Sequence, residues 1–279
     1  MCRMDWKIVA DSSADTLDLP DVSFENVPLH ILAGEREFVD DANLDVNELN
    51  KYMAEYKGTS STSCPSVGDW LNAFGDAKFV LAFTITSGLS GSYSAAQAAR
   101  EQYLEEHPER QVFLVDSLST GPEIGLLIEK AQELIVQDLE PQELYDALQA
   151  YQTHTRLIFS LDSVYNLANN GRVNSLVAKA IGALGIRLFG TASGEGTLEI
   201  LKKCKGFKCA CRSMLDYMEA QGYRKGRIRI AHNGNLEGAE KLGNLIRERF
   251  GNVEISIYAT RGLCSYYAEK GSILLGMEC

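Results

Sequence analysis

The sequence predicts an α/β fold with two domains. Apolar runs of strand length alternate with helical runs over residues 7–151, the pattern of a mainly parallel sheet with helices on both faces. The pattern changes after Leu157, where short strands and helices predict an α+β domain with a mixed sheet. A chain of 279 residues, 45% of them hydrophobic, is long enough for two modest cores. We therefore expect domains at residues 1–153 and 154–279.

Composition and charge exclude several classes of protein. With 38 acidic and 27 basic residues the net charge is -11, which disfavours binding to nucleic acid or to an anionic membrane surface. No apolar run approaches the roughly 20 residues of a membrane span, and the first residues lack the apolar core of a signal peptide. The odd number of cysteines, 7, favours reduced thiols. We expect a cytoplasmic protein.

The sequence gives no indication of a metal or cofactor. Cys204, Cys209 and Cys211 form the one cysteine cluster, and it lacks both a fourth ligand and the Cys-x-x-Cys spacing that zinc favours. Phosphate-loop, kinase and dinucleotide motifs are also absent from the sequence. We expect no cofactor.

The elements of the first domain follow from apolar runs, helical spacing and turn residues. Residues 7–10 predict a buried strand, and the turn Asp11 to Asp15 after it either lines a site or caps the next segment. Ser66 and Asp69 predict a helix cap, and a proline at the first turn opens the helix at 141–151. The other expected elements are a strand at 27–32 with a hairpin return through 38–39, helices at 44–56, 67–74, 94–106 and 124–138, and strands at 79–86 and 111–116.

The second domain is predicted in the same way. Two strands at 186–190 and 197–202 flank a Ser-Gly-Glu-Gly turn, so a hairpin is the simplest connection. The other expected elements are strands at 157–161, 227–231, 253–258 and 272–277, and helices at 163–170, 174–184, 208–218 and 236–250.

Two loops rich in hydroxyl groups predict a binding site. Residues 87–93, Ser-Gly-Leu-Ser-Gly-Ser-Tyr, connect a strand to a helix, and the glycines allow the backbone to approach a ligand beside the free N–H groups of the helix start. Residues 59–66 carry hydroxyls at six of eight positions and also precede a helix. We interpret the loops as walls of one site in which Thr62 and Ser90 hold a carboxylate. The alternative is that both loops only cap helices.

These loops resemble the paired signature loops of the DegV family of bacterial fatty-acid-binding proteins. The resemblance runs from about Lys7 to Gly276. Four further segments agree with the family in order, and they are Ala10-Asp11-Ser12-Ser13-Ala14-Asp15, Val27-Pro28-Leu29, Val115-Asp116-Ser117 and Asn170-Gly171-Arg172-Val173. The resemblance implies a DegV-like fold that encloses a long-chain fatty acid between its domains. It also implies that the protein is not an enzyme, and that it presents the carboxylate to a separate fatty acid kinase for phospholipid metabolism.

The resemblance also suggests the lipid-binding residues. They are Thr62, Ser63, Ser87, Ser90, Gly91, Arg172 and Tyr267. Arg172 either reaches the site or a partner, or makes a surface cap contact. Tyr267 is placed by counting back from Gly271, because the family usually has His-x-Gly-Pro-Gly where this chain has Tyr-Ala-Glu-Lys-Gly. A second departure is Lys203-Cys204-Lys205-Gly206, where the family usually has Lys-x-Arg-Gly.

Two enzymatic alternatives are also visible. Residues 88–92, Gly-Leu-Ser-Gly-Ser, nearly match the nucleophile elbow Gly-x-Ser-x-Gly of α/β-hydrolases. The alternative function is therefore a serine esterase or hydrolase that uses Ser90. Asp162 and His232 follow Ser90 in the order that the acid and the histidine of such a triad would take. Cys64 lies just before a helix start, where thiol pKa values fall, and is the second candidate nucleophile.

Overall fold

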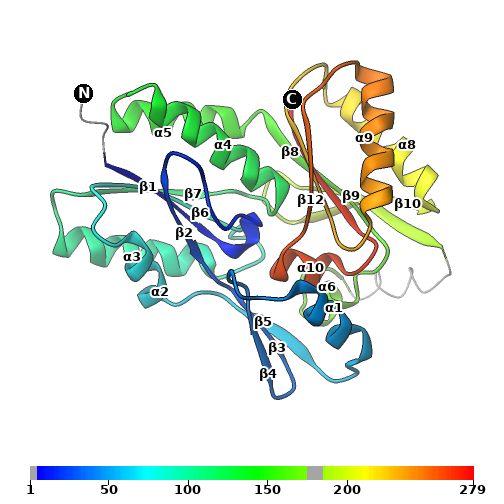
Figure 1. Ribbon diagram of the computed structural model, residues 1–279, viewed down its shortest axis with the longest axis horizontal. Helices are drawn as coiled ribbons and strands as arrows, with labels where there is room; N and C mark the ends of the chain where they lie inside the picture. The colour runs from blue at the N-terminus through cyan, green and yellow to red at the C-terminus, as the bar shows by residue number, and fades with distance from the viewer. Residues whose placement is uncertain (1–4, 175–184) are drawn as a thin grey trace.

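The computed structural model describes residues 5–174 and 185–279, and this part of the chain forms three β-sheets (Figure 1). A parallel sheet has the order β2-β1-β6-β7, a mixed sheet has the order β10-β9-β8-β13-β11-β12, and a small antiparallel sheet has the order β4-β3-β5. The parallel sheet is built from the N-terminal part of the sequence and the mixed sheet from the C-terminal part. The predicted fold class is therefore confirmed.

The parallel sheet is covered by helices on both faces, as expected. Its central strands are apolar on both sides because each face packs against helices: Val9, Val80 and Ala82 contact one layer, and Ile8 and Leu81 the other. The strands are β1 (Trp6–Asp11), β2 (Ser23–Val27), β6 (Phe79–Thr84) and β7 (Gln111–Asp116). One face carries α2 (Val67–Phe74) and α3 (Ser92–Glu106), the other α4 (Pro122–Val136) and α5 (Pro141–Gln152). The capping box of Ser66 and Asp69 at the start of α2 is confirmed.

The small sheet corrects two expectations. The expected strand at 27–32 is wrong, because β2 ends at Val27 and β3 begins at His30 in a different sheet. The expected loop at 59–66 contains a strand, β5, in which Thr62 pairs with Ile31. A run of serine and threonine has no apolar alternation, so only its pairing with β3 reveals it as a strand. The elements are β3 (His30–Ala33), β4 (Arg36–Val39), β5 (Ser60–Ser63) and helix α1 (Val46–Glu55).

The mixed sheet also has two covered faces. Helices α8 (Phe207–Ala220) and α9 (Leu236–Phe250) pack on one face, and the other face turns toward the short helix α10 (Gly262–Ala268), which was not expected (Figure 1). The predicted hairpin is confirmed as the antiparallel pair β9–β10. The expected helix at 174–184 lies outside the described residues, except for Asn174. The other elements are β8 (Thr155–Leu161), α6 (Tyr165–Asn169), β9 (Ile186–Ala192), β10 (Leu198–Lys205), β11 (Ile228–His232), β12 (Ile255–Ala259) and β13 (Ile273–Glu278).

Helix α4 joins the two large sheets. Its first turn lies so close to β13 that a Cβ atom added at Gly276 would be 2.7 Å from the carbonyl carbon and oxygen of Pro122. The helix therefore packs on the parallel sheet with one face and on the mixed sheet with another. Because of this packing, the carboxyl ends of β1, β6 and β7 face α10 and β8. Ligand sites in open α/β sheets form at the carboxyl ends of the strands.

Candidate functional site

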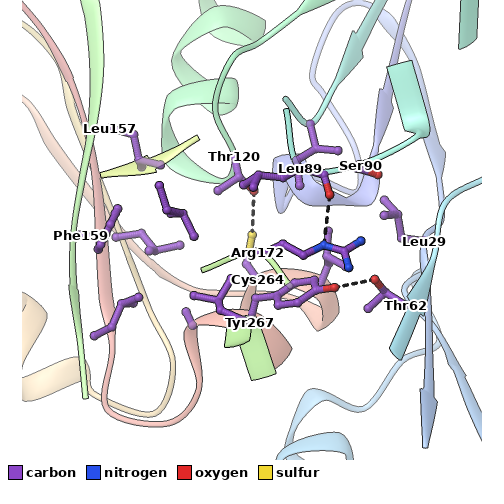
Figure 2. A pocket seen from close by; sticks show the side chains of 17 residues that line it. Leu29, Thr62, Leu89, Ser90, Thr120, Leu157, Phe159, Arg172, Cys264 and Tyr267 are labelled. Carbon is purple, nitrogen blue, oxygen red and sulfur yellow. Dashed lines mark hydrogen bonds between the residues drawn. The ribbon is translucent and has the colours of Figure 1, made fainter. Parts of the chain in front are cut away.

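A narrow cavity lies between the parallel and mixed sheets (Figure 2). The volume open to the centre of a water molecule is about 70 Å³. Most of its lining is aliphatic, and its polar side chains gather mainly at one end, where Thr62, Ser90, Arg172 and Tyr267 lie. The lining residues are Leu29, Thr62, Ile85, Leu89, Ser90, Thr120, Leu157, Phe159, Leu161, Leu167, Arg172, Leu198, Leu263, Cys264, Tyr267, Ala268 and Leu274. Such a cavity suits an unbranched apolar chain with one polar end.

Four separate segments bring the polar end together. Thr62 lies on β5, Ser90 in the turn before α3, Arg172 just after α6, and Tyr267 on α10. The Thr62 hydroxyl and the Tyr267 phenol are hydrogen-bonded at 2.7 Å, and Arg172 Nε donates to the Leu89 carbonyl at 3.2 Å (Figure 2). The residues are up to 205 positions apart in the sequence.

The polar end combines neutral donors with one cation. Burial raises the pKa of Tyr267, while the Thr62 hydrogen bond and the Arg172 charge act in the opposite direction. The phenol therefore remains protonated at neutral pH and can donate a hydrogen bond. Hydroxyl donors and a guanidinium together form a site for a carboxylate, because charge-assisted hydrogen bonds are the strong ones.

Tyr266 supports the polar end from behind. Its phenol is hydrogen-bonded to Ser60 Oγ at 2.7 Å and accepts from Asn170 Nδ2 at 3.0 Å. Its ring packs edge-on against Tyr267, with 4.8 Å between the centroids. One buried side chain thus fixes β5, α10 and the segment that carries Arg172 relative to one another.

Asp11 holds the turn that carries Ser90. Its carboxylate accepts hydrogen bonds from Ile85 N at 2.9 Å and from Ser92 Oγ at 2.6 Å, and burial raises its pKa. Next to it, Ser12 Oγ accepts from Leu29 N at 3.0 Å. The turn after β1 therefore positions two walls of the cavity through hydrogen bonds of Asp11 and Ser12 within the protein.

The structure places the seven predicted residues in two groups. Thr62, Ser90, Arg172 and Tyr267 line the cavity, and Arg172 also donates to the carbonyl of Asn170 at the end of α6, which is the cap contact of its alternative interpretation. The other three predicted residues, Ser63, Ser87 and Gly91, are exposed and are not among the lining residues.

The cavity also contains a polar pair that the sequence did not suggest. Thr120 Oγ1 lies 3.6 Å from Cys264 Sγ, partway along the cavity (Figure 2). Thr120 follows the end of β7, where a site residue could have been expected. Cys264 lies on α10, which was not predicted at all.

The arrangement does not support the two enzymatic alternatives. Asp162 Oδ1 forms an ion pair with Arg187 Nη1 at 2.7 Å, and His232 is a buried residue at the end of β11. Neither lines the cavity that contains Ser90. Cys64 is exposed and does not line it either. Within the described ranges, no group of three or more His, Cys, Asp or Glu side chains could hold a metal ion.

Comparison with known proteins agrees with this architecture. Residues 5–277 match a family model described as "Uncharacterised protein, DegV family". A DegV domain-containing protein of Streptococcus pneumoniae is 43% identical over 279 residues, with 99% of each chain covered.

Two crystal structures are similar over almost the whole chain. One is a DegV family protein from Eubacterium eligens loaded with heptadecanoic acid, with a TM-score of 0.96, 42% identity, and coverage of 98% of this chain and 99% of that one. The other is the Fatty Acid Kinase (Fak) B3 protein of Streptococcus pneumoniae loaded with linoleic acid, with a TM-score of 0.96, 43% identity and 99% of each chain covered. Because the family model and these relatives span nearly the full length, this chain belongs to the DegV family.

Proposed function

We propose that this protein encloses one long-chain fatty acid between its two sheets. The carboxylate binds Thr62, Ser90, Tyr267 and Arg172, and the acyl chain occupies the apolar part of the cavity. The observation that carries the proposal is the cavity itself, which is apolar except for a cluster of donors at one end and the Thr120–Cys264 pair. The fatty acids in the two similar crystal structures support the same ligand class.

The acyl chain supplies most of the affinity in this proposal. Each buried methylene contributes up to about 0.8 kcal/mol, so a dozen contribute up to about 10 kcal/mol. A hydrogen bond to a charged group contributes about 1.5 to 3 kcal/mol. The polar end therefore fixes the orientation of the ligand, and the aliphatic walls retain it.

We further propose a binding role without catalysis, in which a separate fatty acid kinase acts on the presented carboxylate. A protein that is 43% identical carries the name Fatty Acid Kinase (Fak) B3, which supports a kinase partner. Ser90 Oγ accepts a hydrogen bond from Ser92 N at 3.2 Å, and the histidine and aspartate considered for a triad do not line the cavity that contains Ser90.

The six described cysteines are free thiols, in keeping with a cytoplasmic location. We retain the domain boundary at residues 153 and 154, so that the cavity lies between two domains.

Mass spectrometry of an organic extract tests the ligand class. We expect the purified protein to contain a fatty acid of C14 to C18, and the delipidated protein to bind added palmitate. The ligand should be released slowly, because the methylene chain must leave an apolar cavity. An extract without lipid, from protein that also fails to bind added fatty acid, would contradict the proposal.

Two serines of one loop separate binding from hydrolysis. Ser90→Ala should weaken palmitate binding about tenfold to a hundredfold, since it removes a donor to a charged group. Ser87→Ala, in the same loop but outside the cavity lining, should leave affinity within about twofold because surface substitutions have small effects. A fluorophosphonate probe should label neither serine in the unmodified protein. Stoichiometric labelling of Ser90 would favour the hydrolase.

A further inference from the structure

A second, larger cavity borders the first. Its volume is about 700 Å³, and it opens beside the start of β8, between α5 and the β9–β10 hairpin. Its lining mixes polar and apolar surface, and the polar side chains include Glu123, Gln152, Arg156, Thr191 and Glu199. The first cavity is narrow and mostly apolar, whereas the second is wide and lined by many polar side chains.

Strands β8 and β9 separate at the boundary. Their ladder runs from Leu161 and Leu188 to Ile158 and Thr191, and this pairing ends at the latter two residues. Leu157 is therefore the first residue of β8 beyond this ladder. Its carbonyl accepts a hydrogen bond from Thr191 Oγ1 at 2.7 Å, so the backbone at this point remains fixed.

Leu157 occupies the position between the two cavities. Among the residues that the structure describes, it is the one that lines both. It is only 2% exposed, and Figure 2 shows it across the narrow cavity from Thr62 and Leu29. Thr62 belongs to the end proposed for the carboxylate, so Leu157 lies where the methyl end of a bound chain would point.

We infer that Leu157 is the end wall of the acyl cavity and sets the longest chain that the protein binds well. The inference rests on the proposed function. A chain that reaches Leu157 is buried throughout, whereas a longer chain must bend back or displace this side chain. Both responses cost free energy, because a packed interior resists added volume.

Replacing Leu157 by alanine should open the wall. The change removes the branched end of the side chain and joins the narrow cavity to the wide one. The extra methylenes of a longer acid then enter the second cavity, where they contact the aliphatic parts of its lining and remain partly hydrated. The gain per methylene is therefore smaller than in the narrow cavity.

Leu161 provides a matched control. It lies on the same strand and the same face, is also 2% exposed, and lines the narrow cavity without bordering the wide one. Leu161→Ala therefore removes the same atoms from the same kind of environment and leaves the end wall intact. Both variants should lose comparable stability, because each removes the same atoms from a buried leucine.

The experiment measures the dissociation constants of delipidated protein for palmitic (C16) and docosanoic (C22) acids. The informative quantity is the ratio of the C22 constant to the C16 constant. We expect Leu157→Ala to lower this ratio at least tenfold relative to the unmodified protein, and Leu161→Ala to change it less than about threefold. An unchanged ratio in Leu157→Ala, or an equal fall in both variants, would overturn the inference.

Two further measurements keep the outcome clear. Leu157→Val removes a single methylene, should fold like the unmodified protein, and should lower the ratio by a smaller factor. If Leu157→Ala does not fold, an unchanged ratio in Leu157→Val overturns the inference.

Palmitate binding by the unmodified protein separates the two proposals. Its failure would remove the proposed function, and with it the ligand, whereas palmitate binding with an unshifted ratio would remove only the role of Leu157.

Discussion

Two of the hydroxyls at the polar end, those of Thr62 and Tyr267, are hydrogen-bonded to each other at 2.7 Å. A carboxylate bound there can accept a hydrogen bond from each of them. We expect Tyr267→Phe to weaken palmitate binding about tenfold to a hundredfold, since a hydrogen bond to a charged group contributes about 1.5 to 3 kcal/mol. Titration of delipidated protein measures this change.

Tyr266→Phe is the control for that substitution. The Tyr266 phenol bonds to Ser60 and Asn170 behind the cavity, so its loss should lower stability by about 1 to 3 kcal/mol and alter affinity less than Tyr267→Phe does. Unchanged affinity in Tyr267→Phe would show that the phenol is not a ligand contact. Tyr267 itself should add no pH dependence to binding between about pH 6 and 8, because burial raises its pKa further from this range.

Asp15 predicts a pH dependence of stability. Burial raises its pKa from 3.8 to about 7. Between these values the folded protein retains a proton that the unfolded chain has lost, so the free energy of unfolding falls as pH rises through this window. Asp15→Asn cannot ionise and can still accept the hydrogen bond from Arg261 N, observed at 2.8 Å. The variant should therefore gain stability relative to the unmodified protein, by on the order of 2 kcal/mol between pH 5 and pH 8.

Urea unfolding at pH 5 and pH 8 measures that difference. Asp138→Asn is the matched control, because Asp138 has the same left-handed backbone conformation, φ 56° against 55° for Asp15, but is exposed. It measures the effect of exchanging Asp for Asn at a left-handed residue that is not buried. A difference for Asp15→Asn that does not change between pH 5 and pH 8 would mean that Asp15 ionises as readily in the folded protein as in the unfolded chain.

At the scale of elements, the tip of the β9–β10 hairpin packs closely on the loop that precedes α3. A Cβ added at Gly88 would lie 3.0 Å from the Glu195 carbonyl oxygen, and one added at Gly196 would overlap Thr86 Oγ1. Gly196 also has φ +72°, which an alanine adopts only with strain. We expect Gly196→Ala to lower stability by about 1 to 3 kcal/mol and to speed ligand release, because the tip must move off the loop that carries Ser90.

Gly194 tests whether the effect belongs to this contact. It lies in the same turn, and a Cβ added there meets nothing within 4 Å. Gly194→Ala should change stability by less than about 0.5 kcal/mol. Thermal unfolding and the rate of exchange of bound palmitate for a labelled analogue compare the two variants. Equal behaviour would show that the close contact at Gly196 has no effect on the ligand.

The elements that the sequence predicted are those with a strong local pattern. The apolar strand β6, the capped helix α2 and the β9–β10 hairpin all carry such patterns, and all three are present. Strand β5 depends on pairing with β3, and α10 on the carboxylate of Asp40, which accepts from Gly262 N at 2.9 Å and Leu263 N at 2.8 Å. Because these partners are distant in the sequence, no local pattern revealed either element.

The site shows the same limit. Thr62 and Ser90 lie in recognisable sequence motifs, and Tyr267 was located only by its distance from Gly271. The resemblance also suggested Ser63, Ser87 and Gly91, which are exposed and do not line the cavity. Leu157 and Cys264 could not be identified, since nothing in a strand or helix pattern says which apolar residue will border a cavity.

Across the whole molecule, polar contacts cross the proposed domain boundary at several points. Arg229 Nη1 lies 2.5 Å from Glu129 Oε1 on α4, and Thr155 Oγ1 donates to the buried Glu123 at 2.7 Å. Asp15 in turn accepts from the backbone of Arg261 at 2.8 Å. Together with the close packing of Pro122 on Gly276, these contacts mean that each half has buried polar groups that hydrogen-bond to the other half.

We therefore expect the two proposed domains to unfold together. Both tryptophans, Trp6 and Trp70, are buried in the N-terminal half, so tryptophan fluorescence reports on that half, whereas far-UV circular dichroism reports on both. The two urea transitions should coincide, as a single cooperative unit requires. Saturating palmitate should shift both midpoints by the same amount, because a ligand bound between the sheets stabilises only the joined state. A fluorescence transition separated from the circular dichroism transition would show that the halves unfold independently, and the shared helix α4 would then be the element to dissect first.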